Sequence, residues 1–206
     1  MGSAIEHIKH LREESGAGVM DCRAALEQAG GNYALALAEL RQQAEKKAAQ
    51  RSGHAATQGR IELYAHANGR IGVMVEINTE TDFAGRSEVV RSFAHEIALQ
   101  IAAAAPLYVR DEDIPAEVLA EKAQKAAEQA RSAGKTERLI ERIVEGTLKK
   151  FKDEQVLLRQ ASIRDEQVGI AQLLSTTAAS VGENVVIRRF VRWELADGDT
   201  SGLEKI

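Results

Sequence analysis

The spacing of apolar residues changes along this chain from a helical repeat to strict alternation and then back again. Up to about residue 40, and again from about residue 90, apolar side chains recur every three or four positions, which is typical of amphipathic helices. Positions 61–65 and 71–77 instead alternate between apolar and polar, as does the segment 185–195, so each of these predicts a strand. We therefore predict an α+β fold in which helices cover one face of a small three-stranded antiparallel sheet.

Three short helices are predicted at the N-terminus, over about residues 4–14, 19–29 and 32–40. Glycines at 16, 18, 30 and 31 separate them, and Asn32 is a typical N-cap for the third. A core built by so few residues is marginal by itself, so we expect this module to dock on another surface. Cys22 falls on the apolar stripe of the second helix, and we interpret it as a small core residue.

The segment from residue 41 to residue 58 is rich in Ala, Gln, Lys and Arg and has almost no large apolar side chain. It predicts a solvated linker helix that frays, with few contacts crossing it. We accordingly divide the chain into a docking module, residues 1–53, and an α+β core, residues 54–206. In the core we expect further helices from Val90 to a point before Pro106, over 115–132, from Thr136 and over 168–181.

The hairpin between the first two strands has two possible registers. A two-residue loop pairs position 63 with 74 and places the two apolar rows on opposite faces of the sheet. A three-residue loop of Ala67, Asn68 and Gly69 pairs position 63 with 73 and aligns both rows. We predict the three-residue loop because it gives one apolar face.

Composition narrows the classes of function. The 206 residues include 27 basic and 31 acidic side chains, a net charge of −4, which argues against a binder of nucleic acid driven by charge. The most apolar window, 97–109, falls short of the roughly 20 residues that a membrane span needs. With one cysteine and no basic, apolar leader pattern, we expect a cytoplasmic protein that does not bind membranes.

No local motif predicts catalysis or a cofactor. His7 and His10 are three residues apart, but no second half-site at ligand spacing accompanies them, so we expect two solvent-facing imidazoles and no metal. The segment from Gly16 to Gly18 lacks the third glycine and the Lys-Ser/Thr pair of a phosphate loop. We predict that the chain is not an enzyme.

One turn is unusual. Phe83 follows Thr81 and Asp82 and precedes Ala84 and Gly85, between a predicted strand and a predicted helix. Either Phe83 folds back on the next helix as a hydrophobic staple, or it is an aromatic anchor presented to a partner. The residues alone leave both interpretations open, and Asp82 is a candidate cap for the helix that follows.

Several longer motifs resemble one family. IKHLREESGAGVMDCRAALEQAGGNYALALAELR resembles the N-terminal ubiquitin-associated-like module of bacterial elongation factor Ts, and GRIGVMVEINTETDFAGRSE is similar to the strand and TDFV signature of that family. Two later segments, GKTERLIERIVEGTLKKFKDEQVLLRQ and GENVVIRRFVRWEL, resemble its two C-terminal signatures. The motifs follow in the family's order over nearly the whole chain.

The resemblance implies a guanine-nucleotide exchange factor that binds elongation factor Tu in its GDP-bound and nucleotide-free states. It implies that the N-terminal module docks on the G domain of elongation factor Tu, through a stretch that includes Arg12, Val19 and Met20. It also implies that the turn of Thr81, Asp82, Phe83 and Ala84 lies beside the Mg²⁺ and switch region of that partner, where the aromatic ring disturbs the Mg²⁺ site.

The sequence departs from the family at the turn, where Ala84 and Gly85 replace the usual Val and Ala. This change is expected to trim apolar bulk behind Phe83 and to add flexibility. At 206 residues the chain resembles the family's short form, without room for the second core repeat or the helical-hairpin insertion of longer members. Uncovered sheet edges then favour a homodimer formed through the core.

Two other classes of function remain open. One is an adaptor outside translation, whose three-helix module binds a ubiquitin-like or helical partner. The other is an RNA-associated structural protein that uses the basic residues Lys46, Lys47, Arg51, Arg188, Arg189 and Arg192. The negative net charge argues against the second, and the TDF turn has no role in the first.

Overall fold

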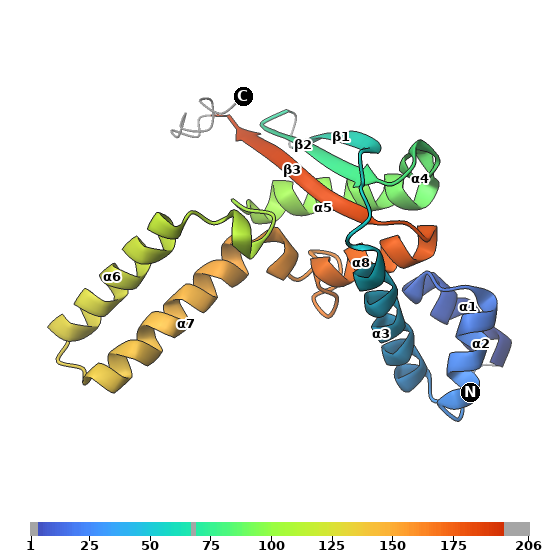
Figure 1. Cartoon of the computed structure of the whole chain (residues 1–206), viewed down its shortest axis with the longest axis horizontal. Coiled ribbons are helices and arrows are strands. Elements are labelled where there is room, and N and C mark those ends of the chain that lie inside the picture. Colours follow the sequence, from blue (N-terminus) through green and yellow to red (C-terminus); the bar gives the residue numbers. More distant parts are fainter. Residues whose placement is uncertain (1–3, 67–68, 196–206) are drawn as a thin grey trace. The chain divides into compact units, whose positions relative to one another are not determined.

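The computed structural model describes residues 4–66 and 69–195 (Figure 1). The chain divides into two compact units, one of residues 1–102 and 171–206 and the other of residues 103–170. The predicted α+β class is confirmed, since helices accompany a three-stranded antiparallel sheet. The boundary predicted between residues 53 and 54 lies inside the first unit, and it stays a prediction.

The first unit begins with three helices, α1 (Ala4–Ser15), α2 (Val19–Gln28) and α3 (Tyr33–Arg51). Their shared core is small and consists of the buried residues Leu11, Cys22, Ala25, Leu26, Ala36 and Leu40. Asn32 caps α3 as predicted, because its side chain accepts a hydrogen bond from the Leu35 amide at 3.2 Å. The solvated linker helix predicted over residues 41–58 is the second half of α3, which runs without a break to Arg51 and buries Ala44.

The sheet consists of β1 (Gln58–His66), β2 (Ile71–Thr79) and β3 (Val185–Glu194), in that order. Helix α5 (Glu88–Ala104) runs across one face (Figure 1). Its His95 stands 5.7 Å from the ring of Tyr64 on β1. Val75 and Ile77 of β2 are fully buried, so the hydrophobic core of the sheet lies on this face.

The predicted hairpin register is wrong. Leu63 pairs with Met74 and Tyr64 pairs with Val73, which is the pairing that places the apolar rows of β1 and β2 on opposite faces. Ala67 and Asn68 of the connecting loop lie outside the described residues. The chain therefore has a second apolar face on its sheet, turned away from α5, which consists of Ile61 and Leu63 on β1, Met74 on β2, and Val191 and Trp193 on β3. Leu63 is 71% exposed there and Trp193 is 63% exposed.

Two further helices complete the first unit. The short α4 (Asp82–Arg86) follows β2 directly, and α8 (Ile170–Val181) precedes β3. Because α4 occupies positions predicted as a turn, the sequence pattern missed it. A helix of five residues is too short for an apolar repeat to show.

The second unit contains a helical hairpin. Helices α6 (Ala116–Ser132) and α7 (Glu137–Gln155) run side by side, joined by four residues that include Gly134 (Figure 1). The helices predicted over 115–132 and from Thr136 are confirmed, and they form this hairpin. Single 3₁₀ turns, η1 (Asp111–Asp113) and η2 (Leu157–Arg159), flank the pair.

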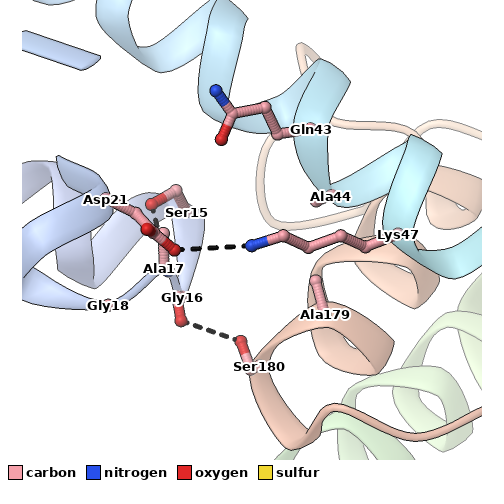
Figure 2. Close-up of a pocket in the computed structure, with 10 residues that line it drawn as sticks. All are labelled: Ser15, Gly16, Ala17, Gly18, Asp21, Gln43, Ala44, Lys47, Ala179 and Ser180. Atoms are coloured by element: carbon pink, nitrogen blue, oxygen red, sulfur yellow. Dashed lines mark hydrogen bonds and ion pairs between the residues drawn. The ribbon is translucent and has the colours of Figure 1, made fainter. Parts of the chain in front are cut away.

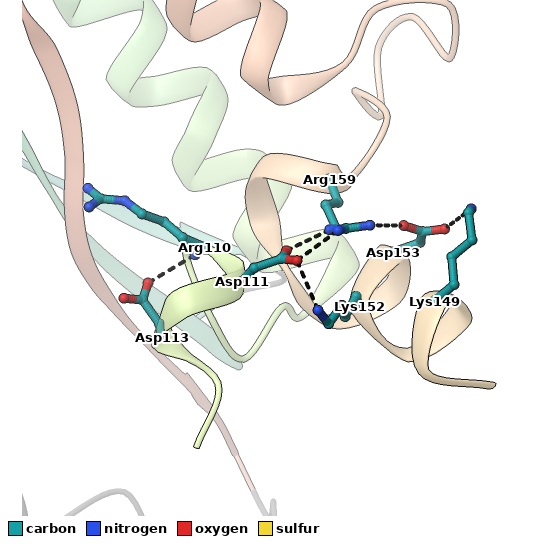
Figure 3. Close-up of polar contacts among 7 residues, drawn as sticks. All are labelled: Arg110, Asp111, Asp113, Lys149, Lys152, Asp153 and Arg159. Carbon is teal, nitrogen blue, oxygen red and sulfur yellow. Dashed lines mark hydrogen bonds and ion pairs between the residues drawn. The ribbon is translucent and has the colours of Figure 1, made fainter. Parts of the chain in front are cut away.

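A network of charged side chains joins η1, η2 and the end of α7 (Figure 3). Asp111 accepts two hydrogen bonds from the guanidinium of Arg159, at 2.6 and 2.7 Å, and lies 3.2 Å from the ammonium of Lys152. Arg159 also donates to Asp153 at 2.9 Å, and Asp153 pairs with Lys149 at 2.6 Å. These cations, Arg159 first, hold the pKa of Asp111 below its usual range.

Candidate functional site

The turn that resembles the TDFV signature is the first turn of α4. Thr81 is the N-cap, since its hydroxyl oxygen accepts a hydrogen bond from the Ala84 amide at 3.3 Å. Asp82 is the first helical residue and pairs with Arg86 at 2.9 Å. The candidate cap at Asp82 is wrong, because Thr81 caps α4 and the Ser87 hydroxyl accepts a hydrogen bond from the Val90 amide at 3.2 Å at the start of α5.

Phe83 points away from the protein surface and is 81% exposed, whereas the neighbouring Ala84 and Gly85 are buried. The side chain therefore does not pack back on the next helix, and the interpretation as a hydrophobic staple is wrong. An exposed phenylalanine gains nothing from burial in the free chain, but it can supply a large apolar contact to a partner. The structure is thus compatible with the anchor interpretation, which stays a prediction.

The turn is held from a distant part of the sequence. Glu183, in the loop between α8 and β3, accepts a hydrogen bond from the Thr81 hydroxyl at 2.6 Å and another from the Thr81 amide at 2.9 Å. The hydroxyl of the fully buried Thr79 donates to the Thr81 carbonyl at 2.6 Å. Glu183 could not be predicted from the sequence, because a single glutamate 102 residues away gives no local signal.

The three candidate docking residues flank one turn of the N-terminal module. Arg12 is exposed in the last turn of α1, and Val19 and Met20 begin α2. Met20 is 72% exposed, and Val19 is half exposed. These exposed apolar side chains are available to a partner, and their role in docking stays a prediction.

The same turn also contacts α8 within the first unit (Figure 2). The Ser180 hydroxyl donates a hydrogen bond to the Gly16 carbonyl at 3.1 Å, and Lys47 of α3 pairs with Asp21 of α2 at 3.4 Å. A Cβ atom at Gly16 would collide with the Ser180 hydroxyl, and the φ angle of Gly16 is +65°. The glycine-rich segment is therefore explained by close packing against a helix, without a phosphate ligand.

The other candidate groups for chemistry have ordinary surroundings. The ring of His7 contacts that of Tyr33, and His10 lies 3.5 Å from Glu13. Within residues 4–66 and 69–195, no three His, Cys, Asp or Glu side chains are grouped so that they could hold a metal ion. Cys22 is buried as predicted, and burial raises the pKa of its thiol. Across these residues, no helix is long and apolar enough to span a membrane.

An exposed aromatic ring on a turn held by hydrogen bonds, a small module with an exposed apolar end, and an open apolar sheet face together define a protein that acts by binding other macromolecules. Comparison with known proteins shows which protein family the chain belongs to. The model of the family described as elongation factor TS matches residues 25–197. The chain belongs to the elongation factor Ts family, and it therefore has a role as a translation elongation factor.

Individual relatives agree over almost their full length. The chain is 48% identical to an elongation factor Ts of Carboxydothermus hydrogenoformans over 191 residues, which cover 93% of this chain and 88% of that protein. It is 49% identical to one of Rubrobacter xylanophilus over 195 residues, which cover 95% of this chain and 100% of the relative. The predicted resemblance to bacterial elongation factor Ts is confirmed.

Proposed function

We propose that this chain is a guanine-nucleotide exchange factor for elongation factor Tu. It binds that partner with GDP bound or with the nucleotide site empty, and it accelerates GDP release so that GTP can bind. The observation that carries the proposal is Phe83, an aromatic side chain left in solvent on a turn whose backbone is fixed by Thr79 and Glu183. The proposed place of action is the cytoplasm, where ribosomes translate.

The proposed mechanism uses binding energy alone. Phe83 inserts between switch-region side chains of elongation factor Tu and disturbs the Mg²⁺ that bridges nucleotide and protein, which weakens the hold on the β-phosphate. No covalent bond forms or breaks, so the chain needs no catalytic group or cofactor of its own. The coupling is reciprocal, so GDP must weaken the binding of this chain by the same factor as the chain weakens the binding of GDP.

The turn acts as a pre-formed element in this mechanism. The Thr81 cap and the two hydrogen bonds to Glu183 fix the backbone that carries Phe83 before any partner arrives. Binding then costs little ordering entropy at this site, and more of the contact energy is available to distort the partner. Arg12, Val19 and Met20 are the proposed second contact, on the G domain.

Release of a fluorescent GDP from elongation factor Tu tests the proposal. With excess unlabelled GDP, we expect the release rate to rise with the concentration of this chain and then to saturate. No acceleration at any concentration would contradict the exchange function. Binding of RNA with steep salt dependence would favour the RNA-associated alternative, and binding of a ubiquitin-like protein without an effect on GDP would favour the adaptor.

We further propose that the chain forms a homodimer through its sheet. The support is the apolar face of Leu63, Met74 and Trp193, which α5 does not cover. Contiguous apolar patches on a sheet commonly mark interfaces, and a twofold dimer is the commonest way to cover one.

A further inference from the structure

Three segments that are distant in sequence meet at one carboxylate, Glu80, the residue before the capped turn. The first is the end of α3 with the residues after it, which connects the N-terminal helices to β1. The second is the turn itself, and the third is the loop between α8 and β3. Contacts of this kind were not expected, because the composition of residues 41–58 predicted a linker that few contacts cross.

Glu80 binds both other segments. One carboxylate oxygen accepts a hydrogen bond from the backbone amide of Asn184 at 2.6 Å and lies 3.3 Å from the guanidinium of Arg51. The other oxygen lies 3.1 Å from Nδ1 of His54. The Glu80 side chain is 21% exposed, less than either Arg51 or His54, so these two side chains cover it. The Asn184 amide and then His54 lower its pKa, which keeps the carboxylate charged.

Asn184 holds the same connection from the opposite side. Its side-chain amide donates a hydrogen bond to the His54 carbonyl at 2.8 Å, and the residue is only 8% exposed. Glu80 therefore binds side chains of the connection, while Asn184 binds its backbone. We call Arg51, His54, Glu80 and Asn184 the junction cluster.

The junction cluster is continuous with the contacts that fix the turn. Glu183 accepts two hydrogen bonds from Thr81, and the backbone amide of the next residue, Asn184, donates one to Glu80. The loop between α8 and β3 therefore binds two successive residues, Glu80 and Thr81. The segment that connects the N-terminal helices to β1 is therefore bound to the same backbone that presents Phe83. Two binding elements at a fixed separation help each other bind, because the first contact raises the effective concentration of the second.

We propose that Glu80 is a positioning residue that sets the N-terminal module at a fixed place relative to Phe83, so that docking of the module places the aromatic ring at the Mg²⁺ site. This inference rests on the proposed exchange function. Glu80 touches no nucleotide and no partner in this role. Its loss leaves Phe83 and the docking residues intact but weakens the link between them, which then depends on the hydrogen bonds of Asn184 to the His54 carbonyl and of Ser180 to the Gly16 carbonyl.

Glu80→Gln tests the proposal, with Glu62→Gln as the matched control. Glu62 is also a partly buried carboxylate, 15% exposed, that pairs with one arginine and one histidine, Arg60 at 2.7 Å and His95 at 3.3 Å. It lies on β1, outside the junction cluster. For Glu80→Gln we expect the half-saturating concentration for GDP release to rise about three- to tenfold while the rate at saturation stays within about twofold of the parent. Glu62→Gln should change neither quantity.

A second measurement needs no partner. Trypsin cleaves after Arg51, and the junction cluster holds this bond, so the fragment that ends at Arg51 should form about tenfold faster in Glu80→Gln than in the parent or in Glu62→Gln. His54→Ala removes one contact and leaves Arg51 in place for the protease. It should shift both measurements in the same direction by a smaller factor.

The outcomes separate the two proposals. Unchanged cleavage, or faster cleavage with an unchanged half-saturating concentration, would overturn the positioning role of Glu80. A fall in the saturating rate with an unchanged half-saturating concentration would also overturn it, because that is the behaviour expected of a residue at the Mg²⁺ site. If the parent chain itself does not accelerate GDP release, the exchange function has failed, and the cleavage rates alone decide whether Glu80 holds the module to the turn.

Discussion

Gly85 of α4 lies against Gly59 of β1, so close that a Cβ atom at position 85 would stand 2.8 Å from the Cα atom of Gly59. Gly59 has a φ angle of +133°, and a Cβ atom there would collide with the Ile77 carbonyl. The two glycines let α4 pack directly on the sheet. Gly85 therefore serves close packing behind Phe83, which is a different role from the added flexibility expected from the sequence.

We expect Gly59→Ala to lower the free energy of unfolding by about 3 kcal/mol or more, since it adds a backbone clash to an unfavourable φ angle. Gly69→Ala is the matched control, because Gly69 has a φ angle of +82° but no atom within 4 Å of the added Cβ. It should cost only about 1 kcal/mol, for the φ angle alone. Urea denaturation of both variants measures the difference, and equal losses would contradict the packing argument.

The sequence predicted the elements with a strong repeat and missed contacts that have no local signal. A helix or strand with one buried face shows a regular apolar repeat in its sequence. This repeat predicted the helices that begin at Ala4 and Ala116 and the strand that begins at Val185. The hairpin register failed because the prediction assumed one apolar face, and this sheet has two. Glu80 and Glu183 could not be predicted, because their partners lie in other parts of the chain and a lone glutamate is a common surface residue.

Phe83→Ala should separate folding from exchange. Because the side chain is exposed, the variant should melt within about 2 °C of the parent. It should still bind elongation factor Tu but give a much lower rate of GDP release at saturation. Phe93→Ala, in the buried face of α5, is the control for cavity formation and should lose about 3 to 5 kcal/mol of stability. A Phe83→Ala variant that releases GDP at the full saturating rate would disprove the anchor.

Deletion of residues 1–53 tests the proposed domain boundary. The sheet with α5 and α8 keeps its own core, so the remaining chain should fold, as followed by circular dichroism and thermal melting. It should need at least about tenfold more protein for half-maximal GDP release, since one of two linked contacts is lost. The same half-saturating concentration as for the full chain would show that Arg12, Val19 and Met20 do not dock.

Acid should lower the folding stability of the second unit, because it protonates the carboxylate of Asp111. Its pKa lies below that of the unfolded chain, so the carboxylate adds stability above about pH 4 and loses this effect as the pH falls through its folded pKa. Asp111→Asn should therefore cost about 1 to 3 kcal/mol at pH 7, and progressively less as the pH falls toward 3. Urea denaturation at several pH values measures the gap between parent and variant, and a gap that widens in acid would contradict this assignment.

The observed register makes a specific prediction about self-association. Pairing of Leu63 with Met74 places both on the sheet face that α5 leaves open, beside Trp193 on β3. We expect the chain to sediment at micromolar concentration with twice its monomer mass of 22.4 kDa, without any disulfide, since Cys22 is buried.

A charged residue on that face should separate the two copies, because it would be buried without a partner at the interface. Leu63→Lys should therefore shift sedimentation to the monomer mass while leaving the monomer folded, since the side chain is already exposed in the single chain. Leu139→Lys is the control, an exposed leucine on α7 changed in the same way, and it should leave the dimer intact. A parent chain that sediments as a monomer, or a Leu63→Lys variant that stays dimeric, would show that this face is not the interface.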